Sequence, residues 1–146
     1  MTRARRLLCY VYVFIAALAL VATWRHNLAF MADAHGGGFA SFWHALFANH
    51  ATTSITVDIG LFMLAAVIWM VLEARRVGVR FVWLYVLFAM TIAISVTFPL
   101  FLVARERRLA ARGDTATEPE PTAADVAGLA VFGVAMVATA IWIALR

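Results

Sequence analysis

Four long apolar runs, separated by polar segments, dominate the pattern of this chain. They cover residues 7–24, 55–72, 81–103 and 126–145. Each run has about the 17–25 residues with which an α-helix crosses the hydrocarbon core of a bilayer. The pattern therefore predicts an all-α protein, a bundle of four transmembrane helices.

The first run, 7–24, follows the basic residues Arg3, Arg5 and Arg6. A basic start before an apolar stretch is also typical of a secretory signal peptide. Because this run has the length of a full span, we expect a retained signal-anchor helix.

The second run, 55–72, contains one charged residue, Asp58. Its ten Leu, Ile, Phe or Val side chains each favour insertion by about 0.3–0.6 kcal/mol, whereas a central Asp costs about 2.5–3.5 kcal/mol. The apolar side chains outweigh the acid, so we expect this run to insert. A carboxylate inside a span usually faces the bundle or a water-filled space and has a partner there.

The third and fourth runs differ in composition. The third, 81–103, has Pro99 near its far end, where the missing N–H of proline should bend the helix and free the carbonyl of Ser95. The fourth, 126–145, is rich in Ala and Gly, which let helices approach closely in lipid. Residues 109–125 have the composition of a solvated linker. We therefore expect a membrane core at 1–108, a Pro/Glu-rich linker at 109–125 and a fourth transmembrane helix at 126–146.

A shorter periodic stretch lies between the first two runs. Over 39–48, one helical face carries residues at the i, i+3, i+4, i+7 and i+8 positions, namely Phe39, Phe42, Trp43, Leu46 and Phe47. This stretch is too short to span. We expect a short amphipathic helix lying in the outer membrane interface, with Asn49 as its C-terminal cap.

All four histidines also lie between the first two runs, at His26, His35, His44 and His50. Imidazole is a ligand for Zn, Cu or Fe. Spacings of 9, 9 and 6 residues lack the i, i+3 or i, i+4 pairing that brings two ligands to one helical face. The histidines are thus weak metal candidates, the alternative being solvated or interfacial side chains. No cofactor is predicted, although a bound lipid, quinone or carotenoid would suit the many aromatic side chains.

The composition agrees with a lipid environment. The chain is 65% hydrophobic with a mean hydropathy of +0.91, against about 45–50% apolar residues in a soluble domain. The net charge of +4 comes from arginines that lie beside the apolar runs, where they determine topology. Nucleic acid is therefore not an expected partner.

The arginines also predict the orientation. With four crossings and an internal N-terminus, seven arginines are inside (Arg3, Arg5, Arg6, Arg75, Arg76, Arg80 and Arg146) and five are outside (Arg25, Arg105, Arg107, Arg108 and Arg112). This bias predicts a multi-pass protein with both termini in the cytoplasm. The composition, rich in Ala and Arg and without Lys, suggests a bacterium, so the expected location is the bacterial inner membrane. The stretch 105–108 is the exception, because it would have to be translocated.

Several polar residues are expected to meet at the outer end of the bundle, because antiparallel helices bring these ends together. The predicted cluster consists of Trp24, Asn27, Asn49, Asp58, Pro99 and Arg105. We expect Asp58 to pair with Arg105 or with amide donors. The cluster would fix helix packing, bind a headgroup, ion or lipophilic ligand, or form part of an ion pathway.

Several of these residues also occur in a pattern that resembles a known protein family. Trp24, Asn27, the spacing from Asn49 to Asp58, the Glu73-Ala74-Arg75-Arg76 segment, and Pro99-Leu100-Phe101-Leu102 before Arg105 resemble a bacterial domain-of-unknown-function family of small membrane proteins with three to four helices. The resemblance covers about residues 1–108. It implies a membrane location and no particular activity.

Three functions fit this pattern. The first is a non-catalytic accessory or assembly subunit of a larger respiratory, photosynthetic or envelope complex, with other membrane subunits as partners. The second is a binder or carrier of a lipophilic or small polar ligand at an outer-leaflet pocket around Asp58. The third is a metal-dependent membrane enzyme that uses the loop histidines. The absence of an apparent nucleophile–base pair disfavours catalysis.

Overall fold

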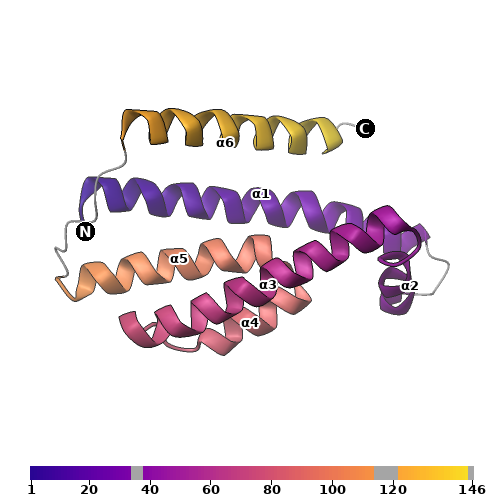
Figure 1. Ribbon diagram of the computed structural model, residues 1–146, viewed down its shortest axis with the longest axis horizontal. Helices are drawn as coiled ribbons and strands as arrows, with labels where there is room; N and C mark the ends of the chain where they lie inside the picture. Colours follow the sequence, from indigo (N-terminus) through magenta and orange to yellow (C-terminus); the bar gives the residue numbers. More distant parts are fainter. Residues whose placement is uncertain (34–37, 114–121, 145–146) are drawn as a thin grey trace. The chain divides into compact units, whose positions relative to one another are not determined.

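The computed structural model describes residues 1–33, 38–113 and 122–144, and these residues form six helices (Figure 1). The helices are α1 (Arg3–Asp33), α2 (Gly38–Ala45), α3 (His50–Val77), α4 (Val82–Thr91), α5 (Ile94–Ala111) and α6 (Ala123–Ala144). The all-α prediction is confirmed for this part of the chain. His35 and most of the predicted linker lie outside the described residues.

Helix α1 is longer than the first apolar run. It continues through residues 25–33, which the sequence pattern left outside the span, and contains 31 residues. At 1.5 Å per residue its length is about 46 Å, whereas the hydrocarbon core of a bilayer is about 30 Å thick. One end of α1 therefore extends beyond the apolar region.

Helix α3 has well-defined caps at both ends. The Asn49 side chain accepts hydrogen bonds from the backbone N–H groups of Ala51 (2.9 Å) and Thr52 (3.0 Å), and the Asn49 N–H donates to Thr52 Oγ1 (3.2 Å). This capping box satisfies donors that a helix start leaves unpaired. The prediction that Asn49 caps the preceding amphipathic helix is wrong, because it begins α3. Gly78, with φ of 78°, ends α3 in the left-handed conformation that glycine adopts without strain.

The third predicted span is not one helix. Residues 81–103 form α4 and the first half of α5, with a break at Ile92 and Ala93. Helix α4 has 10 residues, about 15 Å, which is half the thickness of the hydrocarbon core. The break falls among the β-branched residues Thr91, Ile92 and Ile94, which lower helix propensity, whereas Pro99 lies inside α5.

Hydropathy alone could not detect this break, because a helical hairpin immersed in lipid is as apolar as a straight span. The structure contains three helices that are long and apolar enough to cross a membrane, within Arg3–Asp33, His50–Val77 and Ala123–Ile143 of the described residues. The predicted count of four such spans therefore becomes three, with the α4–α5 hairpin in place of the predicted third span, 81–103.

Helix α5 runs back alongside α4 and packs against α1 and α3 (Figure 1). The buried core lies where α3, α4 and α5 meet and contains Met70, Ala74, Val82 and Phe101. The ring of Phe101 lies edge-on to Trp69 (centroids 6.0 Å apart) and to Tyr85 (5.7 Å), a favourable aromatic geometry. The core thus fixes the hairpin against α3.

The chain divides into two compact units, Met1–Gly113 and Asp114–Arg146. The first unit contains α1 to α5, and the second contains α6. Most large apolar side chains of the first unit remain exposed, among them Leu61, Phe62 and Leu84. A water-soluble protein rarely exposes an apolar surface of this extent, whereas lipid solvates it, so the first unit has the surface of a membrane protein.

Candidate functional site

The first unit has two chemically different ends, and the first is charged. At this end Arg105 bonds through Nε to Glu73 Oε1 (2.6 Å) and through Nη1 to Glu106 Oε1 (2.5 Å). Arg76 holds the same Glu73 with two hydrogen bonds of 2.6 and 2.7 Å. Arg5 Nε lies 3.8 Å from Glu106 Oε2. The network therefore joins α1, α3 and α5.

Both carboxylates of this network are buried, with Glu73 6% and Glu106 4% exposed. A buried carboxylate is costly unless it is paired and hydrogen-bonded. Here each one has at least one guanidinium partner within hydrogen-bond distance. Arg112 adds a link from the end of α5, because its Nη1 donates to the carbonyl of Arg76 (2.9 Å).

These contacts place nearly all arginines at one end of the first unit. They are Arg3, Arg5, Arg6, Arg75, Arg76, Arg80, Arg105, Arg107, Arg108 and Arg112. The sequence-based assignment of residues 105–112 to the opposite side from residues 3–6 is wrong. It assumed a straight third span, whereas the α4–α5 hairpin returns the chain to the side from which α4 starts.

The other end of the unit contains a cavity of about 720 Å³. Helix α1, helix α2 with the following residue, helix α3 and the α4–α5 corner all contribute to its walls. The lining residues are Ile15, Thr23, Trp24, Asn27, Met31, Phe42, Trp43, Leu46, Ile59, Phe62, Met63, Ala89, Met90, Thr91, Ile92, Ala93, Ile94, Ser95, Phe98 and Pro99. We call this cavity the α1–α2 pocket.

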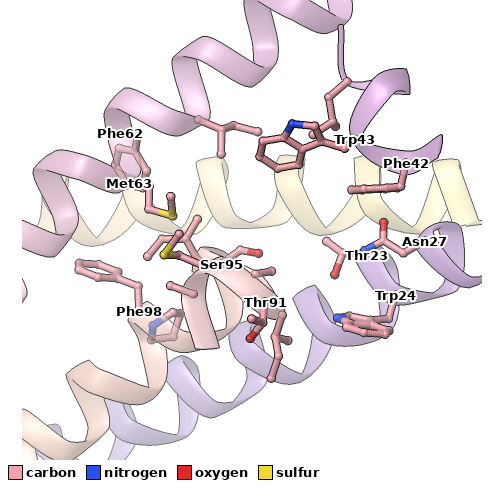
Figure 2. A pocket seen from close by; sticks show the side chains of 18 of the residues that line it. Thr23, Trp24, Asn27, Phe42, Trp43, Phe62, Met63, Thr91, Ser95 and Phe98 are labelled. Carbon is pink, nitrogen blue, oxygen red and sulfur yellow. The ribbon is translucent and has the colours of Figure 1, made fainter. Parts of the chain in front are cut away.

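Figure 2 shows how the walls face one another. Thr23 and Asn27 point from α1 toward Phe42 and Trp43. Helix α2 is held in place by the Phe42 ring, which lies edge-on to Phe30 of α1 with centroids 5.8 Å apart. The predicted amphipathic helix thus exists over a shorter range than 39–48, and part of its apolar face lines the pocket. Its location in the membrane interface stays a prediction.

Trp24 brings an unusual group to the α1–α2 pocket. Its indole Nε1 is buried, and no hydrogen-bond acceptor within the described residues reaches it. An indole N–H that loses water usually finds a partner inside the protein, since an unpaired buried donor costs about 1–3 kcal/mol. In the view of Figure 2 this nitrogen lies on the Thr91 side of the ring.

The two threonine hydroxyl groups of the pocket are already used as donors. Thr23 Oγ1 donates to the carbonyl of Ala19 (2.7 Å), and Thr91 Oγ1 donates to the carbonyl of Leu87 (3.0 Å). Each oxygen keeps lone pairs that can accept a hydrogen bond. The pocket therefore combines a large apolar wall with a few polar groups, among them the buried N–H of Trp24 and the side chains of Asn27 and Ser95.

The predicted polar cluster is only partly assembled. Trp24, Asn27 and Pro99 line the α1–α2 pocket, whereas Asn49 caps α3. Asp58 is exposed on α3, and no hydrogen bond or ion pair joins it to another residue of the described ranges. The predicted pair of Asp58 with Arg105 is not formed, because Arg105 lies at the charged end and binds Glu73 and Glu106.

The three histidines within the described residues, His26, His44 and His50, are all exposed. In the same part of the chain, no three His, Cys, Asp or Glu side chains are grouped so that they could hold a metal ion.

The sequence analysis missed the α4–α5 corner, which contributes Thr91, Ser95 and their neighbours to the α1–α2 pocket. The available signal was the high share of β-branched residues between Thr91 and Thr97, before Pro99. Such residues lower helix propensity. They predict a break in the helix only if a helix can end within the membrane, which happens where its end is covered by protein.

The chain was compared with known protein families, curated proteins and solved structures, and a family match lies within the first unit. Neither a curated protein nor a solved structure matches the chain. The family described as "Protein of unknown function DUF2834" matches residues 11–107, which run from α1 into α5. The protein therefore belongs to this family of unknown function, and its predicted membership of a domain-of-unknown-function family is confirmed.

Proposed function

We propose that this small membrane protein binds a lipophilic molecule with a carbonyl or similar hydrogen-bond acceptor in its head group, and that the α1–α2 pocket is the binding site. The observation that carries the proposal is the buried, unpartnered Nε1 of Trp24 in the lining of a cavity of about 720 Å³. Ligand pockets commonly have volumes of about 300–1,000 Å³ and a few well-placed polar groups.

The lining selects among lipophilic molecules. Phe42, Phe62, Met63 and Phe98 suit an acyl, isoprenoid or polyene chain, because burial of apolar surface is favourable and the contacts are not directional. The Trp24 N–H requires an acceptor, which a quinone or an ester lipid supplies and an unsubstituted hydrocarbon polyene lacks. Quinones and ester lipids therefore fit the pocket better than a plain carotene.

The test is to identify and titrate the bound molecule. Mass spectrometry of a solvent extract from the purified full chain should show a quinone or ester lipid. A short-chain benzoquinone should then bind the delipidated protein. Trp24→Phe removes the N–H and keeps an aromatic ring, so we expect affinity to fall about fivefold, the value of one hydrogen bond.

The matched control is Trp142→Phe, the same substitution on the exposed surface of α6, which should leave binding unchanged. Two results would contradict the proposal. One is an extract without any lipophilic molecule combined with no benzoquinone binding. The other is an equal loss of binding in both variants.

We further propose a bacterial inner membrane location with the charged end in the cytoplasm. Ten arginines gather at this end, and short cytoplasmic segments are enriched in Arg and Lys. The α4–α5 hairpin then enters the membrane and returns to the same side. One crossing by α6 would place the C-terminus outside, opposite to the sequence-based prediction. A reporter that is active only outside the cytoplasm, fused after Arg146, tests this orientation.

A second candidate function is that of an accessory subunit. The observation that favours it is α6, which has the length and hydropathy of a membrane span and is rich in Ala and Gly, which let helices approach closely in lipid. Leucine at Gly128 or Gly133 keeps α6 apolar but prevents the close approach of another helix, so Gly128→Leu and Gly133→Leu should weaken the contact with a partner protein. Purification in a gentle detergent should yield a partner that these variants lose. A lone monomer in every preparation would count against this function.

A further inference from the structure

A second cavity lies at the charged end, in the turn between α3 and α4. Its volume is about 610 Å³. It is lined by residues from the last turn of α3 to the first turn of α4, namely Ala74, Arg75, Gly78, Val79, Arg80, Phe81, Val82 and Trp83. None of these residues lines the α1–α2 pocket. We call this cavity the α3–α4 cavity.

The α3–α4 cavity contains two arginines that the ion-pair network does not use. The carboxylates of Glu73 and Glu106 are engaged by Arg5, Arg76 and Arg105. Arg75 and Arg80 are exposed and, in the described part of the chain, have neither an ion pair nor a hydrogen bond through their side chains. The cavity therefore has two positive charges available for an anion.

Two large aromatic side chains adjoin these charges. Phe81 is 73% and Trp83 is 61% exposed. Phe81 has a φ of 59°, and α4 starts directly after it without a side-chain cap. Aromatic residues at the end of an apolar helix lie where lipid head groups meet the acyl chains. The α3–α4 cavity thus combines cationic and aromatic groups at the level of the head groups.

From this combination we infer a binding site for an anionic phospholipid, with the phosphate between Arg75 and Arg80 and the acyl chains against Phe81 and Trp83. Guanidinium groups bind phosphate oxygens through charge-assisted, often bidentate, hydrogen bonds. The exposed rings select a lipid over free phosphate, because only a lipid brings apolar chains to them. The site is separate from the α1–α2 pocket and does not depend on the function proposed for that pocket.

The experiment measures binding of three probes to the full chain in a neutral detergent. The probes are phosphatidylglycerol, phosphatidylcholine and inorganic phosphate, followed by native mass spectrometry and by the thermal unfolding temperature. We expect phosphatidylglycerol to bind and to raise this temperature. The double variant Arg75→Gln/Arg80→Gln should weaken its binding roughly 30-fold, since each basic residue near an anionic lipid surface contributes about a fivefold effect.

The matched control is Arg107→Gln/Arg108→Gln. These two arginines are also exposed and at the same end, so the variant loses the same charge but leaves the α3–α4 cavity intact. Its affinity should change by less than about threefold. If the first double variant does not fold, the single variants Arg75→Gln and Arg80→Gln replace it, each with a smaller loss.

Three outcomes would overturn the inference. Equal losses in both double variants would show diffuse attraction by the whole charged end. Binding of phosphatidylcholine as tight as that of phosphatidylglycerol would remove the role of the arginines. Stabilisation by inorganic phosphate as large as that by phosphatidylglycerol would show an anion site without a lipid.

Discussion

The two ends of the first unit handle buried polar groups in opposite ways. At the charged end, Glu73 and Glu106 are buried and each is bonded to arginine side chains. At the end with the α1–α2 pocket, the buried Nε1 of Trp24 has no acceptor within the described residues. At the charged end, other side chains of the protein thus pair with the buried carboxylates. At the pocket end, a buried hydrogen-bond donor beside the cavity is left without an acceptor in the described residues.

This difference indicates a division of roles. Buried groups with partners inside the chain hold helices together, and α1, α3 and α5 are all joined by the ion pairs. A buried donor without an internal partner costs free energy unless an external molecule supplies an acceptor. The charged end therefore stabilises the fold, and the pocket end recognises a ligand. Three substitutions test this comparison.

The largest effect is expected from Arg105→Ala, which breaks the ion-pair network. The Arg105 side chain is 14% exposed. Among the described residues, its loss would leave Glu106 with only the distant Arg5 as an ion-pair partner. Removing one member of a buried ion pair costs about 3–5 kcal/mol. We expect the lower end of this range, because Glu73 keeps Arg76. Reversible unfolding in a mixed-micelle titration measures the change.

Arg107→Ala is the control for this substitution, because Arg107 is exposed on the same helix. Its free energy of unfolding should change by less than about 0.5 kcal/mol. Equal stability of the two variants would mean that the ion pairs do not hold the charged end together.

A smaller effect is expected where Arg112 packs over the end of α3. Gly78 has a φ of 78°, and a Cβ placed there would lie 2.8 Å from Arg112 Nη2. Gly78→Ala should destabilise the protein by about 1–2 kcal/mol, mainly because of the left-handed backbone, since the guanidinium can move aside. Thermal unfolding in detergent measures the change.

The same substitution at Gly60 should have the opposite sign. Gly60 lies inside α3, and a Cβ there meets nothing within 4 Å. Alanine is favoured over glycine in a helix interior by about 0.5–1 kcal/mol. If Gly78→Ala and Gly60→Ala shifted stability in the same direction, the left-handed backbone would not explain the glycine at position 78.

The sequence predicted the helical class and the apolar helices well, because hydrophobic length is a direct requirement of the bilayer. It also placed Trp24, Asn27 and Pro99 in one polar cluster, and these residues do line the α1–α2 pocket. The error concerned Arg105 and Asp58. Both residues were predicted to lie at the outer end of the bundle. For Arg105 this prediction assumed that residues 81–103 form one straight helix across the membrane.

That assumption could not be checked by hydropathy, since apolar residues continue across the break at Ile92 and Ala93. Charge pairing carried the missing information. A translocated stretch at 105–108 contradicts the positive-inside bias, while Glu73 and Glu106 needed cationic partners once buried. The excess of arginine after the third run was thus evidence for a hairpin, which the sequence analysis treated as an exception.

The smallest effect is expected at the pocket end, from Trp24→Phe in the protein without a bound ligand. The indole Nε1 has no acceptor within the described residues, so the substitution breaks no hydrogen bond of the chain. It removes an unpaired buried donor, which offsets the loss of ring contacts. We expect the free energy of unfolding to change by less than about 0.5 kcal/mol, as measured by the same micelle titration after delipidation.

Addition of the short-chain benzoquinone should then stabilise the wild type more than the variant, because a ligand that binds more tightly stabilises the folded protein more. A loss of about 2 kcal/mol or more in the delipidated variant would show that the chain itself satisfies the indole, and the two ends would then not differ in the way that the pocket requires.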